Sequence, residues 1–199
     1  DGASIETFDD LRTYCYRVSG AVGLCLVEII GYSDHRSREY AINLGIAMQL
    51  TNILRDVQDD IKAGRVYLPS EDLRQFGVSA PDLMEAHYRD AVVELLRRQA
   101  LRARDFYNRA WKTLPSRDTA QLIATEIIGR TYFELLCRIE ARGFQPSAER
   151  LTLPAGRKLR IAFGCLAKAH LNVRDVVAYL IRPRQVIAMY MKLVARGFP

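Results

Sequence analysis

Residues Asn52–Asp60 read Asn-Ile-Leu-Arg-Asp-Val-Gln-Asp-Asp, and they lie in a helical pattern that we expect to run without interruption over about 39–62. Asn52, Asp56 and Asp60 are spaced by four residues, so a helix places their side chains on one face. Apolar side chains on the neighbouring surfaces predict that this helix is largely buried: Ile46, Leu50, Ile53, Leu54, Val57 and Ile61.

Buried carboxylates need a partner that offsets their charge. In apolar surroundings they are costly unless they are paired or bound to a metal ion. Hard oxygen ligands at this spacing suit Mg²⁺, which is usually held jointly by one or two carboxylates and by substrate phosphates. The spacing alone equally allows an ordinary solvated acidic face, in which Arg55 and Asp59 form an i,i+4 pair.

Two further stretches of sequence bear on this choice. After Asp60 the chain reads Ile-Lys-Ala-Gly-Arg-Val-Tyr-Leu-Pro, in which Gly64 is expected to end the helix and Pro69 to prevent its prompt resumption. Upstream, residues Tyr14–Gly23 read Tyr-Cys-Tyr-Arg-Val-Ser-Gly-Ala-Val-Gly. Glycine inside a helix costs roughly 1 kcal/mol relative to Ala, so the glycines of this second stretch need a reason.

Both stretches resemble motifs of the squalene/phytoene synthase family. The second aspartate-rich motif of that family is typically N-I-L-R-D-V-x-E-D followed by G-R-x-Y-L-P, and its upstream motif is typically Y-C-Y-x-V-A-G-x-V-G. Here Asp59 stands in place of the usual Glu, which keeps the charge, and Ser19 stands in place of the usual Ala. Two long motifs in this order and separation are a specific signal, and a weaker resemblance continues to about Arg160.

The resemblance implies an all-α fold, the isoprenoid synthase helical bundle around a central apolar cavity. Residues 1–199 would form the C-terminal two-thirds of one such domain, with its N-terminal helices missing. Family members carry a first aspartate-rich motif on an earlier helix, and nothing before Tyr14 supplies it here. With half of the metal site, we expect these 199 residues alone to bind Mg²⁺ and substrate poorly and to be inactive.

The implied activity is that of a prenyltransferase of isoprenoid biosynthesis. The downstream spacing looks most like the bacterial hopanoid-pathway branch. Its Mg²⁺-dependent reaction joins two farnesyl diphosphates head to head (1′-1) to presqualene diphosphate, a cyclopropylcarbinyl diphosphate, and onward to squalene. NADPH would be needed only if the squalene-forming step is included. The alternatives are a phytoene synthase acting on geranylgeranyl diphosphate and, in other classes, a non-catalytic assembly or scaffold protein or a lipid-binding protein.

The resemblance also implies roles for particular residues. Asn52, Asp56 and Asp60 are expected to bind the metal ion. They form the catalytic set together with Arg55 and with Tyr14, which in the family faces the diphosphate.

Further residues are expected to bind the substrate, because the family's upstream helix lines the prenyl-chain chamber and its later motifs approach the diphosphate. These residues are Val18, Ser19, Val22, Gly23, Gln49, Arg65, Tyr67, Tyr132 and Arg157. Several alternatives stay open. The glycines could serve close helix packing, Arg65 could cap the preceding helix, Tyr132 could be a core residue, and Lys158 could take the place of Arg157.

Composition is that of a globular protein, with 199 residues of which 49% are hydrophobic and 26% charged. No uninterrupted apolar run reaches the roughly 18 residues of a membrane span. The four cysteines are scattered without a C-x-x-C pair, and we expect them to be buried thiols of a protein in a reducing compartment, the cytoplasm.

The net charge of +6 is concentrated in residues 142–199, which hold 11 Lys and Arg against two acidic residues. Such a region could meet a prenyl diphosphate, an anionic membrane surface or nucleic acid. No RNA-binding aromatic signature or zinc-finger spacing accompanies it, so nucleic acid is not expected. The amphipathic residues 184–196 could rest on a membrane surface or could form a packed terminal helix.

Hydrophobic periodicity predicts helices, and no strand pattern persists. The expected helices cover 8–32, 39–62, 83–114, 117–142 and about 157–180, and Thr7 is the expected N-cap of the first. On the third helix we expect one face to be solvated because it is rich in arginine: Arg97, Arg98, Arg102 and Arg104.

Overall fold

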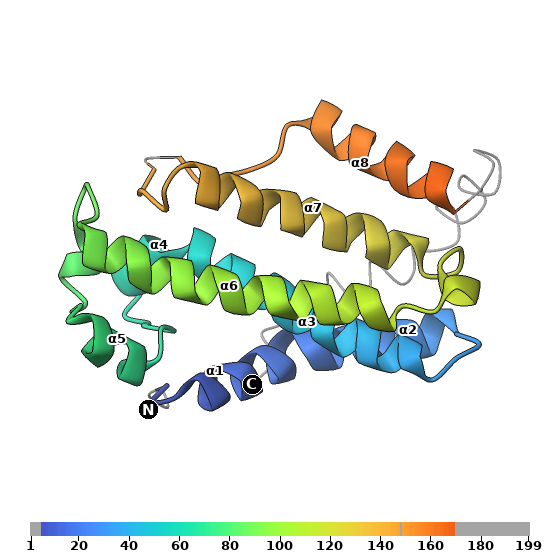
Figure 1. Ribbon diagram of the computed structural model, residues 1–199, viewed down its shortest axis with the longest axis horizontal. Coiled ribbons are helices and arrows are strands. Elements are labelled where there is room, and N and C mark those ends of the chain that lie inside the picture. Colours follow the sequence, from blue (N-terminus) through green and yellow to red (C-terminus); the bar gives the residue numbers. More distant parts are fainter. Residues whose placement is uncertain (1–4, 148, 170–199) are drawn as a thin grey trace.

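The computed structural model describes residues 5–147 and 149–169, and these residues form helices and no strand. The helices lie together as a bundle, with α7 and α8 along the top of Figure 1 and α1 and α2 along the bottom. The expected all-α fold is thereby confirmed. In chain order the elements are α1 (Phe8–Cys15), the π-helical turn η1 (Tyr16–Gly20), α2 (Ala21–Ile30), α3 (Arg36–Arg55), α4 (Val57–Lys62), α5 (Ser70–Phe76), the 3-10 turn η2 (Asp82–Met84), α6 (Asp90–Thr113), the 3-10 turn η3 (Ser116–Asp118), α7 (Ile123–Ala141) and α8 (Ala155–Lys168).

The central element is α3, which packs against α6, α7, α2 and η1. The apolar stripe predicted on α6 is buried against it, as the sequence indicated. Fully burying a large apolar side chain contributes roughly 1.5–3 kcal/mol, so the α3–α6 contact is a main source of stability. Among the largest fully buried side chains of these two helices are Tyr40, Leu50, Leu95, Leu96 and Tyr107.

Glycines let η1 and α2 approach α3 closely. A Cβ atom added to Gly45 would lie 2.7 Å from the carbonyl oxygen of Ser19, and one added to Gly23 would lie 2.8 Å from that of Ala41. Both distances are shorter than real Cβ atoms show, so these positions admit only glycine. Gly23 thus serves the close helix packing that the sequence left open, and its role in binding substrate stays a prediction.

The residues Phe8–Ile30 form one helical run through α1, η1 and α2, and the side chain of Thr7 caps it as expected. By length and composition this run could cross a membrane, since its mean hydropathy reaches 1.3 over 18 residues, of which 17% are buried. The criterion of an uninterrupted apolar run missed it. The same test is passed by core helices of soluble proteins, and the close contacts at Gly23 and Gly45 show that this run packs on α3.

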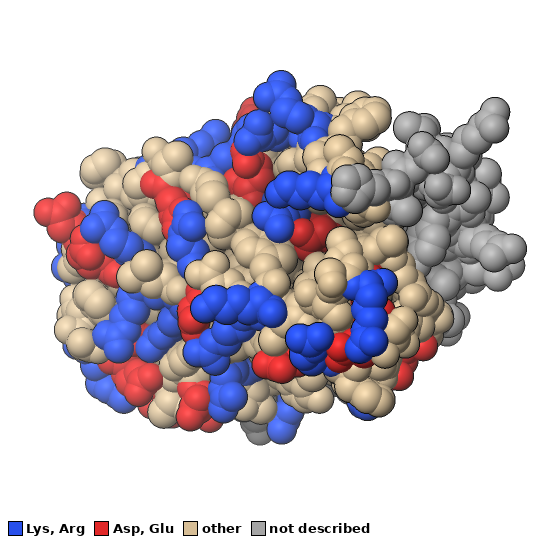
Figure 2. All heavy atoms as spheres, turned by 45° about the vertical axis from the view of Figure 1, so that its right-hand side comes forward, with Lys and Arg blue, Asp and Glu red and all other residues tan. Residues whose placement is uncertain are grey.

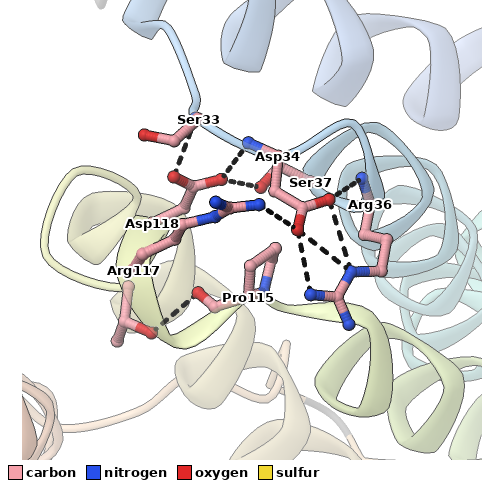
Figure 3. Close-up of polar contacts among 8 residues, drawn as sticks. Ser33, Asp34, Arg36, Ser37, Pro115, Arg117 and Asp118 are labelled. Atoms are coloured by element: carbon pink, nitrogen blue, oxygen red, sulfur yellow. Dashed lines mark hydrogen bonds and ion pairs between the residues drawn. The ribbon is translucent and has the colours of Figure 1, made fainter.

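The turn before α3 is tied to η3 by the buried carboxylate of Asp118 (Figure 3). This carboxylate accepts hydrogen bonds from the backbone N–H groups of Ser33 (2.8 Å) and Asp34 (3.1 Å) and from the hydroxyl of Ser37 (2.7 Å). Arg117 donates to Asp34 at 2.7 Å. Burial by itself would raise the pKa of Asp118, but the hydrogen bonds lower it. The start of α3 is thus fixed by a residue more than 80 positions away.

Two helices begin later than periodicity predicts, α6 at Asp90 and α7 at Ile123. Before α6, the side-chain oxygen of Gln145 accepts from the backbone N–H of Tyr88 at 2.8 Å, and the Tyr88 hydroxyl donates to the carbonyl of Leu83 at 3.0 Å. These tertiary contacts hold the segment outside the helix, and local sequence does not reveal them. The expected continuation of α8 to about 180 and the amphipathic residues 184–196 lie outside the described residues.

The arginine-rich face of α6 is paired rather than simply solvated, which corrects the prediction. Asp72 of α5 is fully buried, and its carboxylate accepts from Arg102 and pairs with Arg98 at 3.3 Å. Arg104 binds Glu140 of α7. These acidic partners lie on other helices, so the sequence pattern of α6 does not show them.

The cysteines follow the prediction in part. Cys15 and Cys165 are buried and Cys137 is half-buried, whereas Cys25 on α2 is exposed, so the prediction is wrong for Cys25. Burial raises the pKa of Cys15 to about 12, so this thiol is unreactive at neutral pH.

Candidate active site

The aspartate stripe lies across the junction of α3 and α4. Asp56 has φ −107° and ψ 16°, outside α-helical values, so the helix that was expected to be uninterrupted is broken at this residue. Two backbone hydrogen bonds nevertheless cross the break. The N–H of Asp56 donates to the carbonyl of Asn52 at 2.9 Å, and the N–H of Asp60 donates to the carbonyl of Asp56 at 2.8 Å. The three residues therefore remain in helical succession.

The carboxylate of Asp56 is held by two arginines. Arg55 donates through Nε at 2.7 Å and Nη2 at 2.6 Å, and Arg150 donates through Nε at 3.0 Å and Nη2 at 2.7 Å. Four such bonds occupy the lone pairs of both oxygens. Burial by itself would raise the pKa of Asp56, but the arginines outweigh burial and lower it to about 2. Asp56 is therefore an anion at neutral pH, and one arginine must leave before its oxygens are available to a metal ion.

Sequence patterns did not indicate Arg150. It lies between α7 and α8, 94 residues from Asp56, and no spacing rule connects the two. The resemblance pointed to Arg157 or Lys158 instead. Arg157 binds Glu134 of α7 at 2.9 and 3.0 Å, and Lys158 is exposed. The structure thus brings Arg150, rather than Arg157, to the aspartate stripe.

Asp60 lies beside two tyrosines that come from both sequence motifs. The ring of Tyr14 stacks on that of Tyr67, with centroids 4.9 Å apart and planes inclined by 24°. Burial raises the pKa of Tyr14, and the hydroxyl of Tyr67 and the charge of Asp60 add to the shift. Burial also raises the pKa of Asp60; the charge of Arg65 opposes this shift, and that of Asp56 adds to it.

Arg65 closes the helix that precedes it, one of the two interpretations that its sequence position allowed, and its binding of substrate stays a prediction. Its backbone N–H donates to the carbonyl of Asp60 at 2.9 Å, which closes α4 together with Gly64 at φ +75°. Its Nη2 also lies 3.5 Å from Oδ1 of Asp60. Because the Arg65 side chain is 57% exposed, this ion pair is weak.

Asn52 carries a buried oxygen that has no partner. Among the side-chain nitrogen and oxygen atoms of the described residues, Oδ1 of Asn52 is the buried one without a hydrogen bond. Its Nδ2 approaches Oε1 of Gln49 at 3.5 Å. Leaving a buried acceptor unsatisfied costs roughly 1–3 kcal/mol, so this atom points to a ligand that the protein binds.

Carboxylate and amide oxygens are the kind of ligand that Mg²⁺ binds. No group of three or more His, Cys, Asp or Glu side chains that could hold a metal occurs in the described part of the chain. Mg²⁺, however, often takes only one or two carboxylates from the protein and fills its other positions with water and phosphate oxygens. Asn52 offers its unpaired Oδ1, and Asp60 offers a carboxylate that is 20% exposed.

The remaining predicted substrate residues differ in how exposed they are. Val18 is 42% exposed, and Ser19 and Val22 are half-buried. Tyr132 is half-buried against the main core and lies near Arg150, whose pKa is raised mainly by its hydrogen bonds to Asp56. The core and active-site interpretations of Tyr132 are therefore compatible.

Named proteins resemble this chain in sequence. The model of the squalene/phytoene synthase family matches residues 1–157. The chain is 38% identical over 168 residues to a 15-cis-phytoene synthase of Synechococcus elongatus, an alignment that covers 77% of this chain and 54% of that protein. It is 36% identical over 184 residues to a phytoene synthase of Arthrospira platensis, with 85% of this chain and 58% of that protein covered.

Solved structures show the same likeness. A dehydrosqualene synthase in complex with ligand aligns with a TM-score of 0.69 at 29% identity, covering 82% of this chain and 58% of that one. The squalene synthase HpnC of Alicyclobacillus acidocaldarius aligns with a TM-score of 0.61 at 28% identity, covering 72% and 55%. The chain thus spans a little over half the length of these relatives. With its motifs in place and a family match over residues 1–157, the chain belongs to the squalene/phytoene synthase family.

Proposed function

We propose that the protein catalyses the head-to-head (1′-1) condensation of two prenyl diphosphates. The observation that carries the proposal is the unpaired Oδ1 of Asn52, which is buried and in helical succession with Asp56 and Asp60. It is an oxygen ligand retained at a cost to stability beside two carboxylates. Mg²⁺ bound with a diphosphate would supply the partner that this oxygen lacks, and family membership supports the same chemistry.

The charged residues of the site have complementary tasks. Asn52 and Asp60, two helical turns apart, would each offer an oxygen to Mg²⁺ bound with the diphosphate, and Asp56 between them would offer another once an arginine has released it. When bound, the ion neutralises charge on the diphosphate oxygens and so eases departure of the leaving group. Arg55 and Arg150 have planar guanidinium groups that bind phosphate in the same two-pronged geometry as carboxylate. They can therefore pass from Asp56 to the diphosphate.

The two tyrosines protect the reacting carbon. Departure of diphosphate leaves an allylic cation, which water would quench. The stacked rings of Tyr14 and Tyr67 lie beside Asp60, and they offer the cation an aromatic surface in place of solvent.

The named relatives and the solved structures favour prenyl diphosphates of different chain length. The relatives from Synechococcus elongatus and Arthrospira platensis are phytoene synthases, which favours geranylgeranyl diphosphate as the substrate. The two solved structures are named as dehydrosqualene and squalene synthases, which favours farnesyl diphosphate. We propose that the protein is at least as well described as a phytoene synthase acting on geranylgeranyl diphosphate as by the farnesyl diphosphate reaction that the sequence spacing favoured. The hopanoid branch and the use of NADPH stay predictions.

Product analysis tests the proposal. The complete gene product, whether or not it extends beyond these 199 residues, is incubated with Mg²⁺ and either farnesyl or geranylgeranyl diphosphate. A C30 or C40 head-to-head product supports the proposal and identifies the chain length. Absence of both, from a folded protein that binds neither substrate, contradicts it. The expected inactivity of residues 1–199 alone stays a separate prediction.

Adjacent aspartates provide a matched pair of variants. Asp60→Asn should lower kcat/KM at least about a hundredfold, because it removes a carboxylate that the diphosphate-bound metal needs. Asp59→Asn should leave activity nearly unchanged, because the Asp59 side chain is 66% exposed and forms an exposed ion pair with Lys62 at 3.5 Å. Equal losses of activity in both variants would show that activity depends on the total negative charge of this segment rather than on the position of Asp60.

A scaffold protein of the same family predicts a different outcome. In the double variant Asp56→Ala and Asp60→Ala, an enzyme loses product formation, whereas a scaffold keeps its partner. Because Asn52, Asp56 and Asp60 are all present in this chain, we favour the enzyme.

We also propose contact with an anionic membrane surface through α8. This helix carries four Lys and Arg residues and no acidic residue. It packs on α7 through Ile161, Cys165 and Leu166, whereas Leu159 and Phe163 are 59% and 61% exposed. Figure 2 shows Lys and Arg side chains beside uncharged surface at the top of the molecule, the level at which Figure 1 places α8. The cytoplasmic location stays a prediction, and the oligomeric state is undetermined.

A further inference from the structure

A cavity distinct from the magnesium and tyrosine cluster is bounded by the arginines that hold Asp56. Its volume is about 430 Å³, and it lies between the α3–α4 junction, the segment before α6 and the chain that follows α7. Arg55 and Arg150 line this cavity, whereas none of Asn52, Asp60 or the stacked tyrosines does. The cavity and the candidate active site therefore share the two arginines as a common wall.

Positive charge prevails on the walls of the cavity. A concave surface with an excess of one charge concentrates ions of the opposite sign. Apolar side chains and the neutral polar side chains of Gln58, Gln145 and Ser147 complete the lining. The Asp56 carboxylate, which Arg55 and Arg150 share, offsets part of their charge. The charged residues that line the cavity are the cations Arg55, Lys62, Arg142 and Arg150 and the acids Asp59 and Glu149.

Two of these cations are available to a ligand. Arg142 follows the last residue of α7, and its guanidinium has no hydrogen-bond or ion-pair partner within residues 5–147 and 149–169. A basic residue at a helix C-terminus is favourable by itself, but here it also faces the cavity. Lys62 contacts Asp59 at 3.5 Å, and both side chains are more than half exposed. Such a pair contributes little and opens readily.

We propose that this cavity binds inorganic diphosphate, the co-product of the condensation proposed above, on which this inference rests. Diphosphate carries several charges on closely spaced oxygens, which guanidinium groups bind in bidentate fashion. Arg55 and Arg150 connect the cavity with the cluster around Asp56, so a diphosphate released there meets cations continuously as it leaves. Arg142 and Lys62 supply contacts that the cluster lacks.

Calorimetric titration of inorganic diphosphate in EDTA tests the inference. Without a divalent metal Asn52 and Asp60 have no means of holding an anion, so binding in EDTA depends on the cationic side chains, and among these Arg142 and Lys62 belong to the cavity and not to the cluster around Asp56. Arg142→Gln should weaken binding about tenfold, as expected for one charge-assisted contact, and adding Lys62→Gln should weaken it further. The matched control is Arg97→Gln, which removes the same charge from an exposed arginine outside the cavity lining. Arg142 is exposed and unpaired, so its substitution should not disturb folding, and thermal unfolding checks this.

The outcomes separate this inference from the proposed function. Weaker binding in Arg142→Gln, unchanged binding in Arg97→Gln and unchanged Mg²⁺-dependent binding of a prenyl thiolodiphosphate support a separate diphosphate site. Equal weakening in both arginine variants would reduce the effect to net charge and overturn the inference. Binding of geranyl diphosphate at least tenfold tighter than that of inorganic diphosphate in EDTA would show a site for substrate and would also overturn it. Loss of Mg²⁺-dependent binding in Asp60→Asn concerns only the proposed function.

Discussion

Replacing Arg150 by Met tests how Asp56 is held. The pKa of Asp56 falls from 3.8 to about 2 in the folded protein, and a shift of this size corresponds to about 2.5 kcal/mol of stability at neutral pH. Two arginines share this effect. The Arg55 side chain is 12% exposed and that of Arg150 is 59% exposed, so solvent screens the contribution of Arg150 more strongly. We therefore expect Arg150→Met to lower the free energy of unfolding by about 1 kcal/mol at pH 7.

The pH dependence follows from the direction of the shift. A carboxylate whose pKa is lowered by folding stabilises the protein above its unfolded pKa, and that stability is lost as pH falls through the folded pKa. The difference between wild type and Arg150→Met should therefore be constant from pH 7 to about pH 5 and shrink between about pH 4 and 2. Urea unfolding at several pH values measures the difference, and carboxylate-detected NMR should show the pKa of Asp56 rising in the variant.

A matched surface arginine provides the control. Arg97 is 55% exposed and pairs with Glu94 at 2.9 Å within α6, so Arg97→Met should change stability by less than about 0.5 kcal/mol. If Arg150→Met were as stable as wild type at every pH and the titration of Asp56 did not move, Arg150 would not hold Asp56 in solution. Arg150 would then have no bond to Asp56 to exchange for one to the diphosphate.

Three other predictions concern the fold and the surface. Asp118→Ala leaves three hydrogen-bond donors without their acceptor, so urea unfolding should show a loss of about 3 kcal/mol; a loss below about 1 kcal/mol would mean that the turn rearranges. Gly45→Ala should cost about 3 kcal/mol because its Cβ would lie 2.7 Å from a backbone oxygen. Gly164→Ala, with open space around it, should instead stabilise α8 by up to about 1 kcal/mol; similar effects at both glycines would contradict the packing. Phe163→Ser should weaken binding to anionic vesicles, measured by sedimentation, about tenfold. Leu101→Ser changes an equally exposed residue of α6 and should leave vesicle binding unchanged. Equal vesicle binding by both variants would exclude α8 as the contact.

Much of the fold could be predicted because helical periodicity is local. The apolar stripe of α6, the cap at Thr7 and the helix end at Gly64 all depend on neighbours within a few residues, and each is present as predicted. The late start of α6 was missed because Gln145 holds the backbone of Tyr88 from a distant turn. Cys25 was expected to be buried because its neighbours are apolar, yet it lies on the exposed side of α2.

The candidate active site shows the same contrast between local and tertiary features. The sequence by itself determined the succession of Asn52, Asp56 and Asp60, because spacing by four is a property of one helix, and the motifs indicated the family. Only the tertiary structure decided which cations meet these groups. Arg150 reaches Asp56 across 94 residues and Arg157 turns to Glu134 instead, because the packing of α7 and α8 sets where each arginine lies. A charge pairs with what the folded chain brings near it, and a linear pattern carries no record of that.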